Sequence, residues 1–189
     1  MENERQALRR EKIQNRNALT EAERAEYSAR ISEHICATEV FRRARTLLLY
    51  RAAGAEVNVD AVWREAERLG KRTAFPACVG AGEMIALCPP SAEAWSVGAY
   101  GIWEPLREKS QLVSPEEPDL IVCPCTAFDA EGHRLGMGAG YYDRYLPRCT
   151  HAQIIAAAFE TQRAAAVPAE PWDVPMHRIV TERKVYIIK

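Results

Sequence analysis

The sequence of 189 residues contains no long hydrophobic run. A membrane-spanning helix needs about 20 consecutive apolar residues, and no stretch of the chain approaches that length. The chain begins with Met-Glu-Asn-Glu rather than with an apolar leader, so we expect a cytoplasmic protein. The formal net charge is only −1, which disfavours a general nucleic-acid-binding surface. We therefore expect neither a membrane nor a nucleic acid as a partner.

Several common motifs of metal, redox and nucleotide sites are also missing. The six cysteines include Cys123 and Cys125, but one residue separates these two, whereas zinc and redox motifs use a two-residue gap. There is no Gly-Lys-Ser/Thr of a P-loop and no GxGxxG of a dinucleotide-binding fold. The chain also has no serine or cysteine nucleophile motif. We expect the cysteines to be reduced, as is usual in the cytoplasm.

What the sequence does contain is an alternation of helix and strand patterns. Helix formers fill residues 4–19, and the capping box that starts at Thr20 predicts a second helix to about Ala37. A third helix is expected over residues 59–69, capped by Asn58 and ended by Gly70. Residues 89–118 are rich in proline and glycine, which predicts loops with little regular structure. The expected strands are 46–50, 71–75 (ended by Pro76), 84–87, 119–123, 154–159 and 185–188.

Strands that alternate with helices indicate an α/β fold. We expect residues 1–189 to form a single domain, a three-layer sandwich with a largely parallel central sheet and helices on both faces. Ligands of such sheets bind beyond the carboxyl ends of the strands. The loops that follow Tyr50, Val122 and Phe159 are therefore the first places to search for a site.

The loop after Val122 contains the stretch RLGMGAGYYDRYL, which begins at Arg134. Glycine allows positive φ angles and lets a ligand approach the backbone closely. Arg134 and Arg144 carry planar donor groups that suit phosphate, and Asp143 could hold a divalent cation. Helical character resumes near Gly140, where a helix start would add free amides. These residues favour an anion-binding loop, although a glycine-rich connection that simply turns remains open at this point.

The longer stretch AFDAEGHRLGMGAGYYDRYL resembles the signature of the 5-formyltetrahydrofolate cyclo-ligase family, also called 5,10-methenyltetrahydrofolate synthetase. The resemblance covers nearly the whole chain. Four further segments are similar to the family's opening helix, substrate loop, middle motif and closing motif: RQALRREKIQNRNAL, YRAAGAEVNVDAV, YGIWEP and PWDVPMHRIVT. Two departures are modest, since Arg5 stands where many members have lysine and Ala139 where glycine is commoner.

This resemblance implies that the protein converts 5-formyltetrahydrofolate and ATP to 5,10-methenyltetrahydrofolate, ADP and phosphate with the help of Mg²⁺. The formyl oxygen would attack the γ-phosphate, and N10 of the folate would then close the ring. We expect a monomer. A non-catalytic folate- or nucleotide-binding relative and an enzyme for another formylated or carboxylated small molecule are the alternatives.

The resemblance also implies roles for individual residues. Arg134 and Asp143 would be catalytic. Asp143 would be a magnesium ligand, and Asp173 would be a second acidic residue of the metal site. The expected folate-binding residues are Glu56, Met84, Tyr100, Trp103, Gly138, Gly140 and Tyr141. The expected ATP-binding residues are Arg5, Arg9, Arg134, Leu135, Gly136, Met137, Gly138, Ala139, Gly140, Tyr141 and Tyr142.

Two further expectations concern residues near these positions. Arg5, Arg9, Lys12 and Arg16 have the spacing of one helical face. The resemblance assigns only Arg5 and Arg9 to ATP, so Lys12 and Arg16 are expected to belong to an ordinary solvated face. Gln162 follows the strand that ends at Phe159, and we expect it to support the site from behind.

Overall fold

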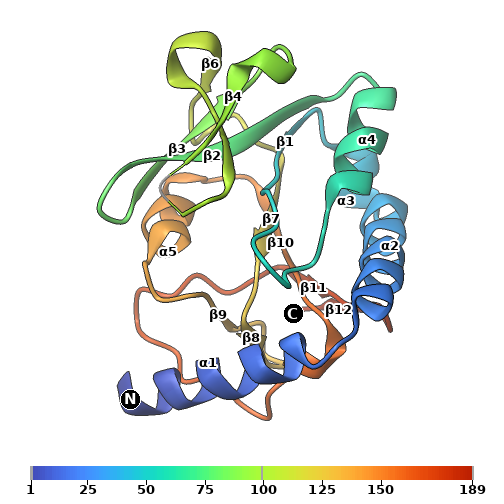
Figure 1. The fold of residues 1–189 in the computed structure, drawn as a ribbon, viewed down its shortest axis with the longest axis vertical. Coiled ribbons are helices and arrows are strands. Elements are labelled where there is room, and N and C mark those ends of the chain that lie inside the picture. The colour runs from blue at the N-terminus through green and yellow to red at the C-terminus, as the bar shows by residue number, and fades with distance from the viewer. Residues whose placement is uncertain (1, 99, 189) are drawn as a thin grey trace.

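The computed structural model describes residues 2–98 and 100–188, and its strands form a large sheet between two layers of helices (Figure 1). The sheet has eight strands in the order β12-β11-β10-β7-β1-β2-β3-β6. Neighbours from β11 through β10, β7 and β1 to β2 are parallel, and the edge strands are antiparallel. The strands are β1 (Thr46–Leu48), β2 (Arg72–Gly80), β3 (Glu83–Cys88), β6 (Gln111–Val113), β7 (Leu120–Pro124), β10 (Gln153–Ala157), β11 (Arg178–Val180) and β12 (Val185–Ile187). The predicted largely parallel sheet is confirmed.

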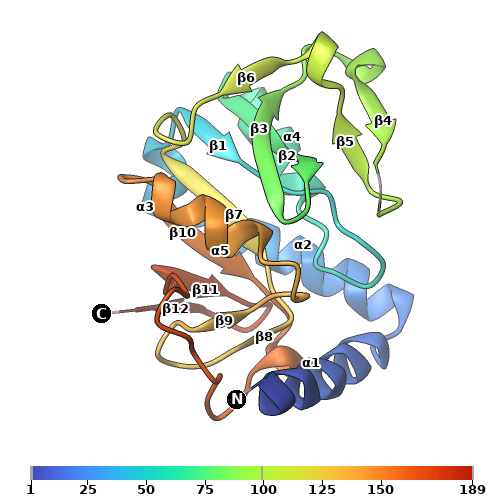
Figure 2. The same ribbon diagram turned by 90° about the vertical axis from the view of Figure 1, so that its left-hand side faces the viewer.

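Helices cover both faces of this sheet, as predicted. On one face lie α2 (Glu21–Ala37), α3 (Glu39–Arg43) and α4 (Asp60–Arg68), and on the other lies α5 (Tyr141–Tyr145) (Figures 1 and 2). Side chains alternate between the two faces of a strand. Leu47 and Val122 therefore pack with the α2 and α3 side, whereas Leu48 and Ile121 pack with the α5 side.

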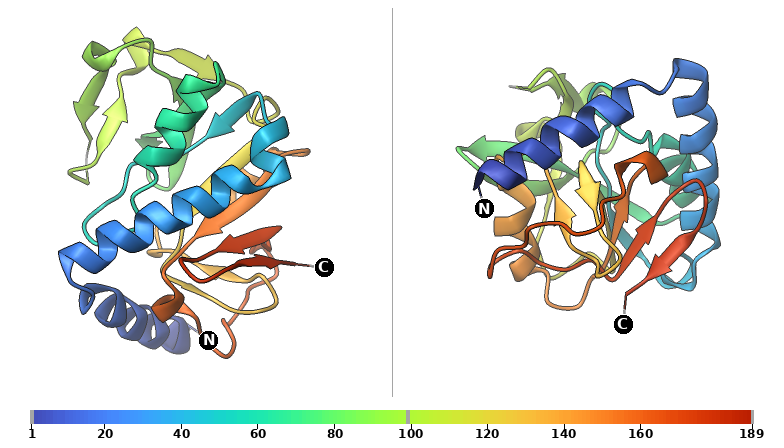
Figure 3. Two further views of the ribbon diagram at one scale, coloured as in Figure 1. Left: turned by 90° about the vertical axis from the view of Figure 1, so that its right-hand side faces the viewer. Right: turned by 90° about the horizontal axis from the view of Figure 1, so that it is seen from below.

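The first helix, α1 (Glu2–Asn17), has an unusual buried face. It crosses one end of the molecule, as the view from below shows (Figure 3). Its apolar contact is small, with Leu8 packed against Ala127 and Leu135. The residues of α1 that are buried are Arg5, Lys12 and Arg16. The expectation of a solvated face at Lys12 and Arg16 is therefore wrong, because this side of the helix lies against the rest of the protein.

The starts of the next helices follow local side-chain chemistry. Thr20 accepts a hydrogen bond from the backbone of Glu23, and the Glu23 side chain accepts one from the backbone of Thr20, so the predicted capping box is confirmed. Helix α4 begins at Asp60 with Val59 at the N-cap. Asn58 still contributes, because its side-chain oxygen accepts from the Asp60 amide at 2.8 Å. The predicted cap is thus displaced by one residue.

Two strand predictions are corrected. Pro76 does not end β2, which continues to Gly80. The segment 89–118 contains more than loops: besides β6 it holds a hairpin of β4 (Trp95–Val97) and β5 (Trp103–Pro105). Sequence patterns also did not indicate β11, α3 or the small hairpin of β8 (Ala127–Phe128) and β9 (Arg134–Leu135). Short 3₁₀ turns complete the fold: η1 (Ala92–Ala94), η2 (Arg107–Lys109), η3 (Leu146–Arg148) and η4 (Glu160–Gln162).

Strands β1 and β7 are neighbours at the point where the chain changes direction across the sheet. From β1 the chain proceeds through β2 and β3 toward one edge, and from β7 it proceeds through β10 and β11 toward the other. Such a switch point leaves a crevice beyond the carboxyl ends of the two strands. Among the described residues, no helix is long and apolar enough to cross a membrane. All six cysteines are free thiols.

Candidate active site

A cavity of about 750 Å³ lies beyond the carboxyl ends of β1 and β7. Tyr50 and Arg51 come from the end of β1, and Cys125 and Thr126 come from the end of β7. Most of the predicted site residues line this one cavity: Arg5, Arg9, Glu56, Met84, Tyr100, Trp103, Arg134, Gly136, Met137, Gly138, Ala139, Gly140, Tyr141, Tyr142 and Asp143. Segments far apart in the sequence thus meet at the switch point of the sheet.

Two predicted site residues, Leu135 and Asp173, do not line the cavity with their side chains. The Leu135 side chain is fully buried in the small cluster with Leu8 and Val167. Only its backbone is left for contact with a ligand. Asp173 lies behind the wall, where its carboxylate holds Arg5.

The glycine loop has the backbone that its composition suggests. Gly138 has a φ of +105° and Gly140 a φ of +71°, angles that L-residues with side chains seldom adopt. A Cβ added at Gly140 would lie 2.9 Å from Nη1 of Arg144. Ala139 has no positive φ, so its replacement of the commoner glycine causes no strain. Gly140 is the N-cap of α5, which has five residues.

Arg134 is the most deeply buried cation at the glycine loop. Its Nη2 donates to Oδ1 of Asp143 at 2.7 Å, and its guanidinium carbon lies 5.4 Å from the centre of the Tyr142 ring. Its Nε is buried without a hydrogen-bond partner. A buried, incompletely satisfied guanidinium next to flexible glycines suits an anionic ligand.

Two arginines of α1 face the same end of the cavity. Nη1 of Arg5 donates to Oδ2 of Asp173 at 2.7 Å and to the carbonyl of Pro168 at 2.9 Å. Nε of Arg9 donates to the carbonyl of Gly136 at 3.0 Å. Burial raises the pKa of Asp173, but the hydrogen bond from Arg5 and that from the Glu170 amide outweigh it and lower the pKa overall. The carboxylate therefore stays ionised and fixes Arg5.

Glu56 lies in the loop after β1. Its Oε2 accepts from the amide of Ala53 at 2.9 Å, and its Oε1 lies 4.0 Å from Nη1 of Arg16. Burial raises the pKa of Glu56 above its usual value, and the Ala53 hydrogen bond and the Arg16 charge reduce this rise without cancelling it. A carboxylate in this environment is an acceptor for ligand N–H groups.

Aromatic side chains border the open part of the cavity. The hydroxyl groups of Tyr100 and Tyr141 are 3.0 Å apart, and their rings meet edge to face. Trp103 is about half exposed, whereas Met84 is buried on β3. Flat apolar surfaces of this kind suit a ring system. Arg144 joins the β2–β3 turn to the glycine loop, since its Nε donates to the carbonyl of Gly82 at 2.7 Å.

Of the two predicted metal-binding aspartates, only Asp143 lines the cavity. Among the described residues, no group of three or more histidine, cysteine, aspartate or glutamate side chains could hold a metal ion. Mg²⁺ usually takes one or two carboxylates and completes its shell with phosphate oxygens and water. Asp143 lines the cavity beside the glycine loop, so its position agrees with such a shared shell.

Sequence reasoning missed several lining residues, notably Arg16, Arg51, Glu104 and Trp172. Arg16 shares the helical spacing of Arg5 and Arg9, which was the available signal. Glu104 and Trp172 stand inside the YGIWEP and PWDVP motifs, next to residues that were selected. Arg51 stacks its guanidinium against Trp63 and Trp95 and pairs with Asp60, contacts that no local pattern indicates.

Gln162 lies behind the cavity, in agreement with the expected supporting role. Its amide nitrogen donates to the carbonyls of Cys125 and Thr126, and its oxygen accepts from the Phe159 amide. It therefore ties the loop after β10 to the loop after β7.

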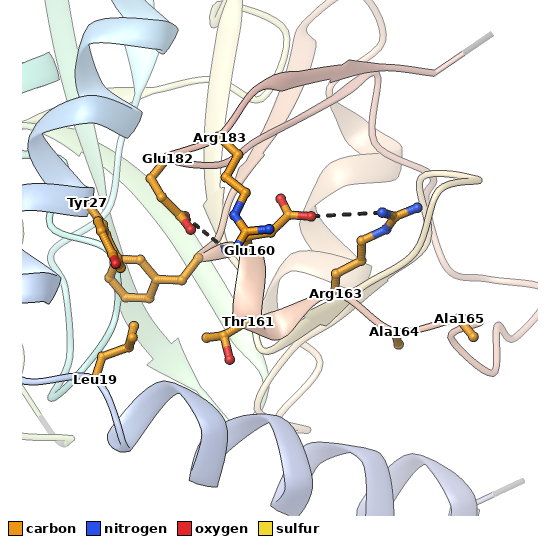
Figure 4. A pocket seen from close by; sticks show the side chains of 10 residues that line it. Leu19, Tyr27, Glu160, Thr161, Arg163, Ala164, Ala165, Glu182 and Arg183 are labelled. Carbon is orange, nitrogen blue, oxygen red and sulfur yellow. Dashed lines mark hydrogen bonds and ion pairs between the residues drawn. The ribbon is translucent and has the colours of Figure 1, made fainter.

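A second cavity, of about 590 Å³, contains none of the predicted site residues (Figure 4). Leu19, Tyr27 and Phe159 form its apolar part. Its charged groups largely satisfy one another or the backbone: Glu160 pairs with Arg163, and Glu182 accepts from the Glu160 amide (Figure 4). The candidate active site is therefore the larger cavity.

Fold and cavity together define a class: an α/β protein with a ligand site at the switch point of its sheet, cationic at the glycine loop and carrying a carboxylate at Glu56. The model of the 5-formyltetrahydrofolate cyclo-ligase family matches residues 1–182. The chain belongs to this family, which confirms the resemblance seen in the sequence.

Individual relatives agree with this membership. The chain is 30% identical to a 5-formyltetrahydrofolate cyclo-ligase of Mycolicibacterium smegmatis over 94% of its own length and 93% of that protein. It is 28% identical to the Escherichia coli K12 cyclo-ligase, over 92% and 97% of the two chains. Its fold matches the NMR structure of Aquifex aeolicus 5,10-methenyltetrahydrofolate synthetase with a TM-score of 0.87 and 31% identity, over 98% and 93% of the chains.

Proposed function

We propose that this protein converts 5-formyltetrahydrofolate to 5,10-methenyltetrahydrofolate, with ATP and Mg²⁺ as required partners. The observation that supports this most is the joint presence of two kinds of subsite in one cavity. Arg134 and the glycine loop suit the phosphates of a nucleotide, and the buried carboxylate of Glu56 suits the N–H groups of a pterin. Family membership and the names of the relatives point to the same reaction.

The nucleotide phosphates bind against the loop from Gly136 to Gly140. Backbone amides there, together with Arg9 and Arg134, supply hydrogen bonds and positive charge to the phosphate oxygens. Arg5 lies behind them, fixed by Asp173. Of the predicted ATP-binding residues, Leu135 contributes only through its backbone.

The folate ring binds with its donor edge toward Glu56. Met84, Tyr100, Trp103 and Tyr141 enclose the ring system, and Gly138 and Gly140 let the substrate approach the nucleotide closely. This arrangement brings the formyl group toward the γ-phosphate. Holding two reactants in such a geometry lowers the barrier substantially without a covalent protein intermediate.

The reaction then has two steps. The formyl oxygen attacks the γ-phosphorus, an O–P bond forms, and the bond from that phosphorus to ADP breaks. N10 next attacks the formyl carbon and loses its proton, while the bond from this carbon to the phosphorylated oxygen breaks and phosphate leaves. Arg134 stabilises the charge on the phosphoryl oxygens during both steps. Mg²⁺, held by Asp143 with Asp173 nearby, would neutralise phosphate charge when bound.

The direct test mixes the purified protein with 5-formyltetrahydrofolate and Mg²⁺, with and without ATP, and follows the absorbance band of the methenyl product. We expect the band to rise only with ATP, and EDTA to abolish the rise. Binding of ATP without any product would contradict the proposal. It would favour a non-catalytic relative or an enzyme for another formylated or carboxylated substrate.

The folate side of the cavity is tested by Glu56→Gln. The amide keeps the size of the side chain but loses the charge and one of two acceptor sites. We expect about 1–3 kcal/mol weaker folate binding, as for hydrogen bonds to a charged group, and unchanged ATP affinity. Isothermal titration with each ligand separates the two effects. Equal folate affinity in the variant and the wild type would contradict the assignment of Glu56 to folate binding.

The remaining expectations also stand as proposals. We infer that residues 1–189 act as a single domain and as a monomer in the cytoplasm. The continuous sheet of eight strands supports the single domain. Sedimentation equilibrium of the purified protein tests the monomer.

A further inference from the structure

Arg16 is buried in the cavity wall without a complete set of partners. Its side chain is 7% exposed, and its Nε and Nη1 have no hydrogen-bond partner. Leaving a guanidinium buried and incompletely paired is costly, so a nearby negative group is expected. That group is Glu56, whose Oε1 lies 4.0 Å from Nη1 of Arg16.

Glu56, like Arg16, is largely buried and has few hydrogen-bond partners inside the protein. Its side chain is 11% exposed, and its one hydrogen bond inside the protein, from the Ala53 amide, occupies Oε2. Oε1 and the second acceptor site of Oε2 are thus left for a ligand, with the positive charge of Arg16 nearby. The two groups are near enough for a strong Coulombic attraction in a buried setting, but no direct hydrogen bond ties them together.

The other titratable groups that face Glu56 do not supply charge. Within residues 2–98 and 100–188 they are Tyr50 after β1, Cys125 after β7 and Tyr142 from α5. Burial raises the pKa of Cys125 to about 12 and the pKa values of the two tyrosines well above their usual range, so all three are neutral at neutral pH. Arg16 is the cation whose charge opposes the effect of burial on Glu56.

We propose that Arg16 is a positioning residue whose buried guanidinium keeps Glu56 ionised, and therefore able to accept two N–H donors of the folate ring. A protonated Glu56 would present one acceptor and one donor, which mismatches a ring edge that carries only donors. Arg16 thereby sets the lowest pH at which the cavity binds folate. This inference rests on the proposed function of the same cavity.

The ionised form of Glu56 is the form that binds folate, so folate affinity depends on pH. Folate affinity is full above the pKa of Glu56 in the free protein and falls as pH drops through it. Removal of the Arg16 charge raises that pKa, so the decline begins at a higher pH.

The test measures kcat/KM for 5-formyltetrahydrofolate against pH in the wild type, Arg16→Met and Arg16→Lys. We expect the acidic limb of Arg16→Met to move to higher pH, with an unchanged KM for ATP, and Arg16→Lys to stay close to the wild type. The matched control is Lys12→Met, which removes a buried cation of the same helix that pairs with Glu11 rather than Glu56. The acidic limb of the pH profile of Lys12→Met should not move.

An unmoved limb in a folded Arg16→Met protein overturns the proposal. If Arg16→Met does not fold, the carboxyl ¹³C signal of Glu56, assigned by its loss in Glu56→Gln, is titrated in the wild type and in Arg16→Gln. A midpoint at higher pH in Arg16→Gln supports the proposal, and equal midpoints overturn it. Failure of the wild type to form product would count against the proposed function instead, and the ¹³C titration would still decide the role of Arg16.

Discussion

At the residue scale, the buried guanidinium of Arg134 depends on one carboxylate. Asp143 accepts from it at 2.7 Å, whereas its other contact, with the Pro124 carbonyl, is 3.4 Å long. The same carboxylate is the proposed metal ligand. Asp143 positions Arg134, and under the proposed function it would also share the charge of the cation.

The substitution Asp143→Asn tests both tasks, and the loss of an exposed ion pair elsewhere is the comparison. We expect a loss of about 1–3 kcal/mol in stability, because the buried guanidinium of Arg134 loses its opposite charge, and a higher Mg²⁺ concentration for half-maximal activity. Urea denaturation and an activity titration with Mg²⁺ measure the two quantities. Glu65→Gln, which breaks an exposed ion pair with Arg68, is the control and should change stability by less than about 1 kcal/mol. A normal Mg²⁺ titration in Asp143→Asn would contradict the metal assignment.

Individual residues differed in how far the sequence could reveal them. Arg134 and Asp143 stand inside a motif of twenty residues, so they were selected at once. Arg16 was set aside, because helical spacing says which residues share a face but not whether that face meets solvent or protein. Its role depends on Glu56, forty residues away in the chain, and such a contact exists only in the folded state.

At the element scale, the glycine loop controls the shape of one end of the cavity, the end at which we propose that phosphate binds. Gly140→Ala would force a side chain into a φ of +71° and place its Cβ 2.9 Å from Arg144. A left-handed conformation costs an L-residue roughly 1–2 kcal/mol. We expect both lower stability and weaker ATP binding, measured by thermal melting and by titration calorimetry.

Gly70→Ala is the matched control for this substitution. Gly70 has a φ of +68°, but nothing lies within 4 Å of the added Cβ, and the residue follows α4 outside the cavity. It should lose stability through the same backbone strain and keep normal ATP affinity. If both variants bind ATP equally well, the glycine loop is not the phosphate site.

The ends of helices and strands were predictable where a side chain bonds to its own segment. They were not predictable where the end depends on a neighbouring strand. The capping box at Thr20 is a local contact, and it was found. Pro76 was expected to end β2, because proline has no N–H to donate. The amide of Leu49 donates to the carbonyl of Ala74, where β1 ends. Pro76 points its nitrogen to the same side, beyond the end of β1, so no ladder hydrogen bond is lost.

At the scale of the whole molecule, the fold class followed from alternation of strands and helices, whereas the order of strands did not. Nothing in the local pattern of β7 says that it lies beside β1, since 71 residues separate the ends of their paired segments at Leu48 and Leu120 in the sequence. The hairpin of β4 and β5 was missed because its strands are three residues long and lie among glycine and proline. Long-range pairing therefore set the limit of prediction.

Because the cavity joins α1 to the sheet ends and the glycine loop, its ligands should stabilise the entire protein. ATP with Mg²⁺ at 100 times its dissociation constant adds about 2.7 kcal/mol of stability. In a chain of this size this corresponds to a rise in Tm of about 5–11 °C. Differential scanning fluorimetry measures it, with GTP and inorganic triphosphate as comparison ligands. An unchanged Tm at saturating ATP would mean that the nucleotide does not bind the folded cavity.

The pairing of Arg5 with Asp173 connects positions 168 residues apart. During synthesis on the ribosome, Arg5 emerges first. It cannot pair with Asp173 until the segment that carries this aspartate has left the exit tunnel. A nascent chain therefore completes this end of its cavity only after the segment that carries Asp173 has been made and has left the tunnel. A product cut short before this segment would be unable to assemble the site, however much of the sheet it had formed.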